Sequence, residues 1–312
     1  MTDTNIPVAN ITELAAQVPA GIRFGTSTWT YPGWKGTVYS RDYPRTGASV
    51  AMLEEYARHP LFRTVGIDSF FYAPPTPRTL EQYAAVLPAG FECVTKVWDR
   101  ITIETFDSPR DRLLRGQANP DFLNADLFLA EVLAPMREHF AGHIGPFMFE
   151  FQRMRGKATF DVFIRRLDDF LAALPPDAPY AVELRNSEFL RPEYFAVLRS
   201  HRVGHVLNSW TAMPRLGEQL LMHESVTAPF VVARALLRPG RRYAEAVDMF
   251  APYDRVQEPN PELRADLAAI AKAAHDLRIP AYLIVNNRAE GSAPETIRAV
   301  AGLVVELLAG SQ

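Results

Sequence analysis

The chain has 312 residues, of which 48% are hydrophobic and 22% are charged, a composition typical of soluble globular proteins. Its formal net charge of −3 argues against general affinity for nucleic acids or anionic membranes, so contact with a polyanion would need a local basic patch. The single cysteine, Cys93, excludes an internal disulfide and CxxC metal chemistry, and its apolar neighbours predict a packed core thiol.

The N-terminal residues lack the basic and apolar regions of a signal peptide, and no apolar run is long enough to cross a bilayer. We therefore expect a soluble, cytoplasmic protein without a membrane partner. The sequence does not indicate the oligomeric state.

Residues 1–20 are expected to form an N-terminal tail with at most a short helix over 11–18, and residues 21–312 a single domain. Short apolar segments bounded by turn residues predict eight strands, at 22–28, 63–71, 91–97, 145–151, 180–184, 204–208, 229–235 and 281–287. Helical patterns lie at 48–58, 79–86, 123–140, 160–173, 192–201, 216–222, 263–277 and 293–308. The segments 99–120 and 238–261 are predicted as long loops.

Regular alternation of strands and helices is typical of α/β proteins with a parallel sheet, and eight such units favour a closed TIM-like (β/α)8 barrel. The alternative is an open doubly wound sheet. That fold would favour a Gly-rich phosphate turn after the first strand, and GxGxxG is absent there.

The segment 22–36 begins as a strand and continues into a loop that holds Trp29, Tyr31 and Trp34. Polar and aromatic loops at strand ends are where α/β proteins build ligand sites, although a packed Ω-loop would look similar. Because the site of such a barrel lies at the C-terminal ends of its strands, we take the candidate residues from those ends. The candidates for catalysis are Asp68, Lys96, Glu150 and Glu183, and those for ligand binding are Trp29, Trp34, Tyr72, Trp98, Gln152, Arg185, Asn208, Trp210, Arg234, Asn286 and Asn287.

Glu150 and Glu183 lie on neighbouring predicted strands and could form a general acid/base pair, as in a hydrolase or a lyase. The alternative is an internal ion network in which Lys96 and Arg185 neutralise the two carboxylates. Lys96 could instead form a Schiff base if burial lowered its pKa.

Arginine and lysine side chains at the strand ends suit a carboxylate or phosphate group, which predicts an anion-binding pocket. All four tryptophans fall on this side of the predicted barrel, so they could form an aromatic-lined cleft that stacks on a flat ligand; packing over the barrel top is the alternative. None of the seven histidines ends a predicted strand, and GxSxG and P-loop patterns are absent. We expect no metal and no cofactor, with Mg²⁺ on Asp68, Glu150 and Glu183 as the alternative.

Two functions follow from these residues. The favoured one is an enzyme that acts on a small anionic molecule containing a ring, such as a sugar phosphate, a sugar acid or a nucleotide. The alternative is a protein that binds or processes nucleic acid with the same aromatic mouth and the arginines of 99–115 and 238–242.

Several motifs resemble those of the YecE-like family of uncharacterised proteins, also called domain of unknown function 72. They are Gly25-Thr26-Ser27 with Trp29 and Tyr31-Pro32-Gly33-Trp34, Phe70-Phe71-Tyr72 before Pro74-Pro75, Pro88-Ala89-Gly90-Phe91 leading to Lys96, Glu183-Leu184-Arg185, and Asn286-Asn287 with Gly291 and Ala293. The chain departs from the family pattern at Gly66, Asp68 and Ile103, so it is identified as a diverged member. The resemblance implies a TIM-like barrel and no particular reaction.

Overall fold

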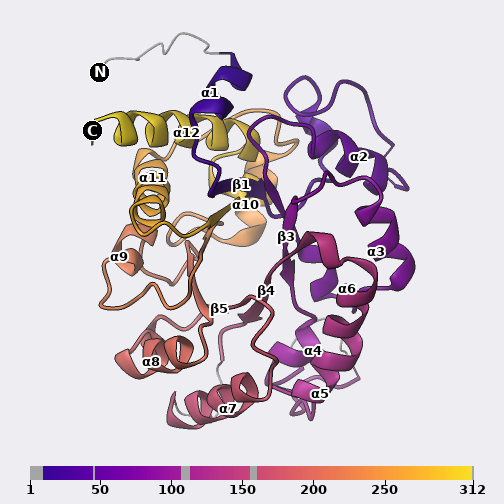
Figure 1. Ribbon diagram of the computed structural model, residues 1–312, viewed down its shortest axis with the longest axis vertical. Coiled ribbons are helices and arrows are strands. Elements are labelled where there is room, and N and C mark those ends of the chain that lie inside the picture. Colours follow the sequence, from indigo (N-terminus) through magenta and orange to yellow (C-terminus); the bar gives the residue numbers. More distant parts are fainter. Residues whose placement is uncertain (1–9, 45, 107–112, 155–159, 311–312) are drawn as a thin grey trace.

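The computed structural model describes residues 10–44, 46–106, 113–154 and 160–310 (Figure 1). Within this part of the chain, eight parallel strands alternate with helices and form a nearly closed barrel, which confirms the predicted TIM-like (β/α)8 fold. The strands are β1 (Ile22–Thr26), β2 (Thr64–Ile67), β3 (Glu92–Lys96), β4 (Ile144–Phe151), β5 (Tyr180–Leu184), β6 (Gly204–Asn208), β7 (Val231–Ala235) and β8 (Ala281–Val285). Their hydrogen-bonded order is β1-β8-β7-β6-β5-β4-β3-β2.

Helices surround the strands in Figure 1 and cover the outer face of the barrel. They are α1 (Ile11–Gln17), α2 (Ser49–Tyr56), α3 (Pro77–Ala84), α4 (Asp99–Thr102), α5 (Ala125–Phe128), α6 (Ala134–His139), α7 (Phe160–Ala172), α8 (Pro192–Ser200), α9 (Leu216–Leu220), α10 (Tyr243–Phe250), α11 (Pro261–Asp276) and α12 (Ala293–Ala309). The apolar stripe of α7 illustrates the packing, because Phe163, Leu167 and Phe170 are all buried. No described helix is both long enough and apolar enough to cross a bilayer.

The barrel closes at the seam between β1 and β2. A parallel bridge joins Phe24 to Phe62, and the hydroxyl of Tyr56 links both strands, since it accepts from the N–H of Thr26 at 2.9 Å and donates to the carbonyl of Thr64 at 3.2 Å. Gly25 allows this close approach, because a Cβ there would lie 2.2 Å from the Thr64 carbonyl oxygen. The seam therefore depends on a missing side chain and on one buried phenol.

Side chains fill the barrel in layers, and two of these layers position the polar residues of the site. The lower layer is apolar and is formed by Val94, Met148, Ala181, Val206, Val232 and Ile284, which pack together in the interior. Side chains two residues further along a strand point the same way, so each of these strands places a polar residue directly above. The upper layer consists of Lys96, Glu150, Glu183, Asn208, Arg234 and Asn286, all of them buried. Strand periodicity thus gathers the polar residues at one end of the barrel.

Three predicted segments need correction. The strand predicted at 63–71 ends at Ile67, because Asp68–Phe71 forms a 3₁₀ turn that brings Asp68 over the barrel. The segment predicted as a loop at 238–261 contains α10, whose buried face consists of Ala246 and Phe250. The segment at 99–120 starts with α4, and its residues 107–112 lie outside the described part, as do residues 1–9 of the predicted tail. Helix α1, also in that tail, lies beside α12 (Figure 1).

Candidate functional site

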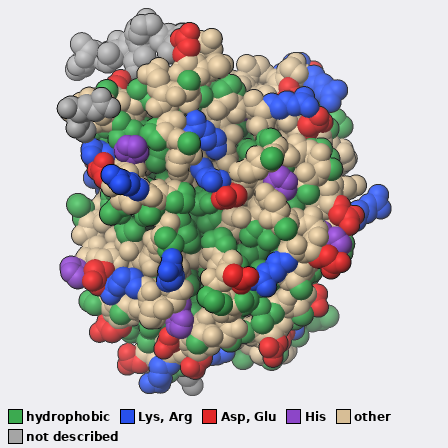
Figure 2. Space-filling model, in the orientation of Figure 1, with side chains coloured by type: hydrophobic (Ala, Val, Ile, Leu, Met, Phe, Trp, Pro, Cys, Tyr) green, Lys and Arg blue, Asp and Glu red, His purple; other side chains and the backbone are tan. Residues whose placement is uncertain are grey.

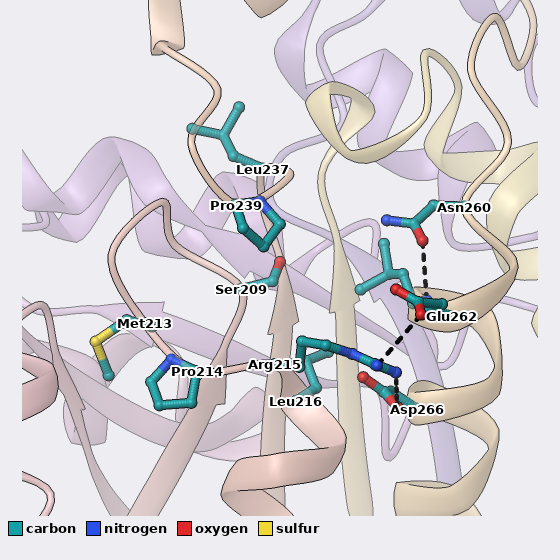
Figure 3. A pocket seen from close by; sticks show the side chains of 11 residues that line it. Ser209, Met213, Pro214, Arg215, Leu216, Leu237, Pro239, Asn260, Glu262 and Asp266 are labelled. Carbon is teal, nitrogen blue, oxygen red and sulfur yellow. Dashed lines mark hydrogen bonds and ion pairs between the residues drawn. The ribbon is translucent and has the colours of Figure 1, made fainter.

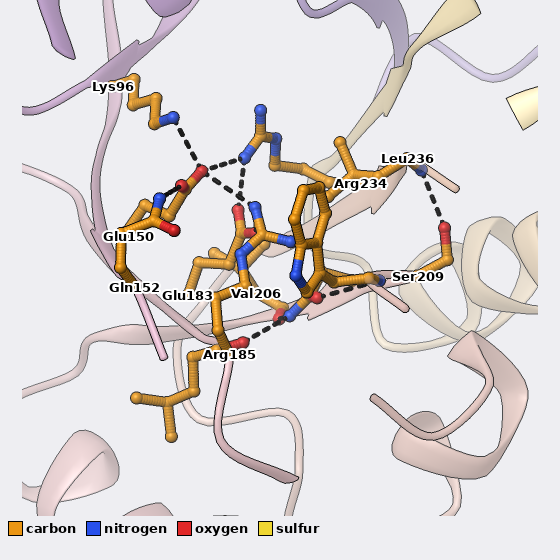
Figure 4. Close-up of polar contacts among 12 residues, drawn as sticks. Lys96, Glu150, Gln152, Glu183, Arg185, Val206, Ser209, Arg234 and Leu236 are labelled. Carbon is orange, nitrogen blue, oxygen red and sulfur yellow. Dashed lines mark hydrogen bonds and ion pairs between the residues drawn. The ribbon is translucent and has the colours of Figure 1, made fainter. Parts of the chain in front are cut away.

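Three cations meet at one carboxylate oxygen in the upper layer of the barrel (Figure 4). Oε2 of Glu150 lies 2.8 Å from Nζ of Lys96, 3.0 Å from Nη2 of Arg185 and 2.8 Å from Nη1 of Arg234. All four side chains are buried. Burial opposes ionisation of Glu150, but Arg185, Lys96 and Arg234 outweigh it and hold the pKa of this carboxyl well below its ordinary value. Glu150 is therefore a carboxylate at neutral pH and a poor proton donor.

Glu183 lies beneath the same arginines. Its Oε1 is 2.6 Å from Nη2 of Arg185 and its Oε2 is 2.6 Å from Nη1 of Arg234, so each guanidinium contacts both glutamates through one nitrogen. The nitrogens occupy the space between the carboxylates, where an acid/base pair of a glycosidase would need a sugar ring. This geometry favours the internal ion network, which was the alternative for these residues.

Asp68 completes the network from the side of β2. Its Oδ2 lies 3.1 Å from Nη2 of Arg234, and about a quarter of its side chain (28%) is exposed. Burial works against the charge of Arg234, but Glu183, Asp68 and Glu150 outweigh this effect and raise the pKa of the guanidinium. Three carboxylates thus face the three cations of the network.

The network forms the floor of a cleft of about 230 Å³ at the C-terminal ends of the strands. Many of the predicted residues line this cleft, namely Asp68, Tyr72, Lys96, Glu150, Gln152, Arg185, Trp210, Arg234 and Asn286. The guanidinium of Arg185 lies 4.1 Å from the ring centre of Trp210, and the ammonium of Lys96 lies 3.6 Å from that of Phe71. Gln152 donates its amide to the other oxygen of Glu150. Aromatic faces therefore cover cations that the carboxylates already hold.

Other predicted residues have packing roles. Trp29 and Trp34 are buried, and their indole N–H groups donate to the carbonyl of Ser49 at 2.8 Å and to Oδ1 of Asn287 at 3.2 Å. Asn208 is also buried, and its amide donates to the carbonyl of Leu184 at 3.1 Å. The buried side chains of Trp29, Trp34, Asn208 and Asn287 are therefore closed to a ligand. Packing, which was the alternative role for the tryptophans, accounts for Trp29 and Trp34. Glu183 and the half-buried Trp98 also lie away from the described cleft lining.

Five residues of the cleft lining were absent from the predicted candidates, namely Phe71, Leu236, Leu237, Tyr243 and Arg288. Arg288 donates through Nη2 to the hydroxyl of Tyr243 at 2.8 Å, and its guanidinium lies 4.2 Å from the centre of that ring. Arg288 directly follows the eighth predicted strand, a position that already places it at the mouth of the barrel, although it was not among the ligand-binding candidates. No comparable signal marks Tyr243, which begins a helix inside a predicted loop.

A second hollow lies beside the cleft, between the β6 loop and the start of α11 (Figure 3). Its volume is about 50 Å³, which leaves room for one or two waters rather than for a ring. Arg215 points across it and lies 3.3 Å from Glu262 and 3.2 Å from Asp266. This arginine is already paired, so we do not count the hollow as a ligand site.

Three arginines of the basic segments proposed for a nucleic-acid patch are paired with carboxylates. Arg238 lies 2.9 Å and Arg241 2.5 Å from the carboxylate of Glu258, and Arg100 lies 2.7 Å from Asp121. Arg110 and Arg112 fall outside the described residues. On the face shown in Figure 2, acidic and basic side chains are intermixed and hydrophobic ones gather toward the centre.

Among the described residues, no group of three or more His, Cys, Asp or Glu side chains has the arrangement of a metal site. The oxygens of Asp68, Glu150 and Glu183, the alternative ligands for Mg²⁺, face guanidinium and ammonium groups instead. The donors of this site are thus nitrogen cations, which suit an anionic ligand.

Comparisons with known proteins agree with this architecture. A family model described as protein of unknown function DUF72 matches residues 23–309. A crystal structure of a DUF72 family protein from Enterococcus faecalis V583 superimposes with a TM-score of 0.65 at 19% identity, covering 91% of this chain and 95% of that chain. One from Thermotoga maritima MSB8 gives 0.60 at 18% identity, with 92% and 99% covered. No curated protein matches the chain. At such identities the solved structures support the fold alone.

Proposed function

Because the chain belongs to the DUF72 family, as its motifs predict, and this family has no known function, we propose a function from the cleft itself. The protein binds a small anionic molecule that carries a ring, and it acts on this molecule as an enzyme at the mouth of the barrel. Sugar acids, sugar phosphates and nucleotides are the ligand classes with this chemistry.

The proposal rests mainly on two N–H-bearing nitrogens of Arg185 that have no hydrogen-bond acceptor among the described residues. Its side chain is buried at the floor of the cleft, and no described residue accepts a hydrogen bond from its Nε or Nη1. Buried donors without partners are costly, about 1–3 kcal/mol each and more for charged groups, so native proteins rarely keep them without a reason. Both nitrogens are closed to solvent beside the ring of Trp210, so an anionic oxygen would accept from them once that ring moves aside.

The walls of the cleft suit a ring. Tyr72 and Tyr243 are about half exposed or more (60% and 51%), and Leu236, Leu237 and Trp210 add apolar surface. Pockets with apolar walls and a few convergent polar groups are typical of small-molecule sites. Of the four tryptophans predicted to stack on a ligand, Trp210 lines the cleft, and Tyr72 and Tyr243 supply further aromatic faces.

Asp68 is the carboxylate best placed for proton transfer. It lines the cleft and is partly exposed, whereas Glu150 is buried among its three cations and Glu183 lies beneath them. We assign Asp68 the role of general acid or base, and Lys96 that of holding the substrate electrostatically. Glu150 and Glu183 hold the arginines in position.

Thermal unfolding with glucuronate, glucose 6-phosphate and AMP tests the binding. At least one should raise the melting temperature, since a ligand present at a hundred times its Kd adds about 2.7 kcal/mol of stability. Arg185→Lys keeps a positive charge beside both glutamates but removes the guanidinium N–H groups, so it should abolish the shift. Arg137→Lys, in an exposed pair with Asp177, is the matched control and should retain the shift. No shift with any probe, or an unchanged shift in Arg185→Lys, would contradict the proposal.

Asp68→Asn tests the catalytic role. The wild-type protein should deplete at least one anionic compound from an extract of small metabolites, as measured by mass spectrometry. The variant should bind that compound with similar affinity but convert it at least about a hundredfold more slowly, the usual contribution of acid/base catalysis. Conversion by the variant at the wild-type rate would show that Asp68 is not the general acid or base.

A further inference from the structure

The charges around the cleft do not cancel. Lys96, Arg185 and Arg234 are matched by the carboxylates of Asp68, Glu150 and Glu183, as their ion pairs show. Arg288 is a fourth cation on the cleft wall, and no described carboxylate lies within ion-pair distance of it. Four cations against three carboxylates leave one positive charge, and it resides on Arg288.

A neutral partner holds this surplus cation in place. Tyr243 accepts from Nη2 of Arg288 and lies under its guanidinium, so the side chain is oriented without being neutralised. A guanidinium has five N–H donors in a fixed plane, so the others remain for a ligand. Arg288 is half-buried, which strengthens its interaction with an anion relative to a fully solvated arginine.

We infer that the cleft selects a carboxylate with a single negative charge over the corresponding phosphate ester, and that the Arg288–Tyr243 pair sets this preference. A carboxylate on the ligand neutralises the surplus charge. A phosphate monoester carries about −1.5 to −2 at pH 7 and would leave excess negative charge beside Asp68 and Glu150. The inference rests on the proposed function and narrows its substrate class to ring-bearing monocarboxylates, such as sugar acids or aromatic acids.

The test compares probes that share a ring and differ in the anion: glucuronate against glucose 6-phosphate, and benzoate against phenyl phosphate. Titration calorimetry at constant pH and ionic strength should give the carboxylate of at least one pair an affinity at least tenfold higher. Arg288→Gln should weaken carboxylate binding tenfold or more and remove the preference. Tyr243→Phe, which keeps the ring and removes the hydroxyl, should lose a few-fold in carboxylate affinity.

Arg137→Gln is the matched control and should bind as the wild type does, and circular dichroism confirms that each variant is folded. Equal or tighter binding of the phosphates would overturn the inference and leave the proposed function intact. Carboxylate binding that is unchanged in Arg288→Gln would overturn the role of Arg288. If no probe of either kind binds to the wild-type cleft, the inference and the proposed function fail together.

Discussion

Glu150 illustrates how a single residue holds the site together. Its buried carboxylate contacts Lys96, Arg185 and Arg234, so all three buried cations share this partner. Because the pKa of Glu150 is lowered on folding, its contribution to stability is present above the unfolded pKa and is lost as the pH falls through the folded one. The ion network should therefore weaken in strong acid and persist at neutral pH.

Glu150→Gln should destabilise the protein by about 3–5 kcal/mol, because it removes the charge that three buried cations share. Urea denaturation at pH 7 measures the loss. Glu224→Gln removes a surface carboxylate that is half exposed and paired with Arg199, so it should change the unfolding free energy by less than about 0.5 kcal/mol. Similar small effects of both substitutions would mean that the network is not structural.

His205 gives the fold a second dependence on pH. Burial lowers its pKa from 6.5 to about 4, and the ring lies against Tyr194, whose hydroxyl is 3.1 Å from Nδ1. Between these two pH values the unfolded chain binds the proton and the folded chain does not, so stability is full above pH 6.5 and falls on acidification.

His205→Gln should reduce the slope of unfolding free energy against pH, between pH 6 and pH 5, by up to about 1.4 kcal/mol per pH unit. Denaturant midpoints at several pH values give this slope directly. His223→Gln, at a side chain that is 90% exposed, should leave it unchanged. An unaltered slope in His205→Gln would show that this ring titrates normally in the folded state.

At the scale of elements, the seam between β1 and β2 decides whether the barrel closes. The strands approach so closely that Gly25 has no room for a side chain, and Tyr56 of α2 supplies hydrogen bonds to both. The same seam brings Asp68, at the end of β2, within reach of Arg234 on β7. Closure of the barrel therefore also places Asp68 in the ion network.

Gly25→Ala should cost more than about 3 kcal/mol, because its Cβ would meet backbone atoms that cannot move without opening the seam. Gly302→Ala is the matched control: it lies within α12 with no atom near its added Cβ, and should stabilise the protein by about 0.5–1 kcal/mol. Thermal and urea unfolding compare the two. A mild effect of Gly25→Ala would show that β1 and β2 can separate.

Local patterns predicted the elements well where an apolar run ended at a turn residue. The strands at 180–184 and 204–208 have the predicted bounds. Prediction failed where tertiary contacts override the pattern. Phe70 and Phe71 continue the apolar run of β2, yet they belong to a turn that places Asp68 over the barrel. Helix α10 has too short an apolar face to stand out from its charged neighbours.

The site was predictable to the extent that it follows from strand ends. In a parallel barrel, polar residues two positions beyond an interior apolar residue must converge, which is why Lys96, Glu150 and Arg234 were found from the sequence. Whether an aromatic residue is buried or lines the cleft depends instead on how the loops fold back onto the barrel. Trp34 is buried against Asn287, near the other end of the chain, and no local signal indicates that contact.

In the molecule as a whole, the residues that stabilise the barrel lie deeper than the residues that line the cleft. The apolar layer of the interior and the helices outside it form the core, and the ion network above them forms a buried floor. The segments that follow β2, β7 and β8 add the exposed Tyr72 and Tyr243 and the half-buried Arg288. A cleft built on such a floor has its cations oriented before a ligand arrives.

We propose that this cleft binds a ring-bearing anion through Arg185 and Arg288. A crystal structure of the wild-type protein soaked with glucuronate tests this binding mode. We predict density for the carboxylate within hydrogen-bond distance of both guanidinium groups, with the ring against Tyr72 or Tyr243. Glucuronate bound elsewhere on the molecule, or an empty cleft at a concentration that saturates binding in solution, would contradict the claim.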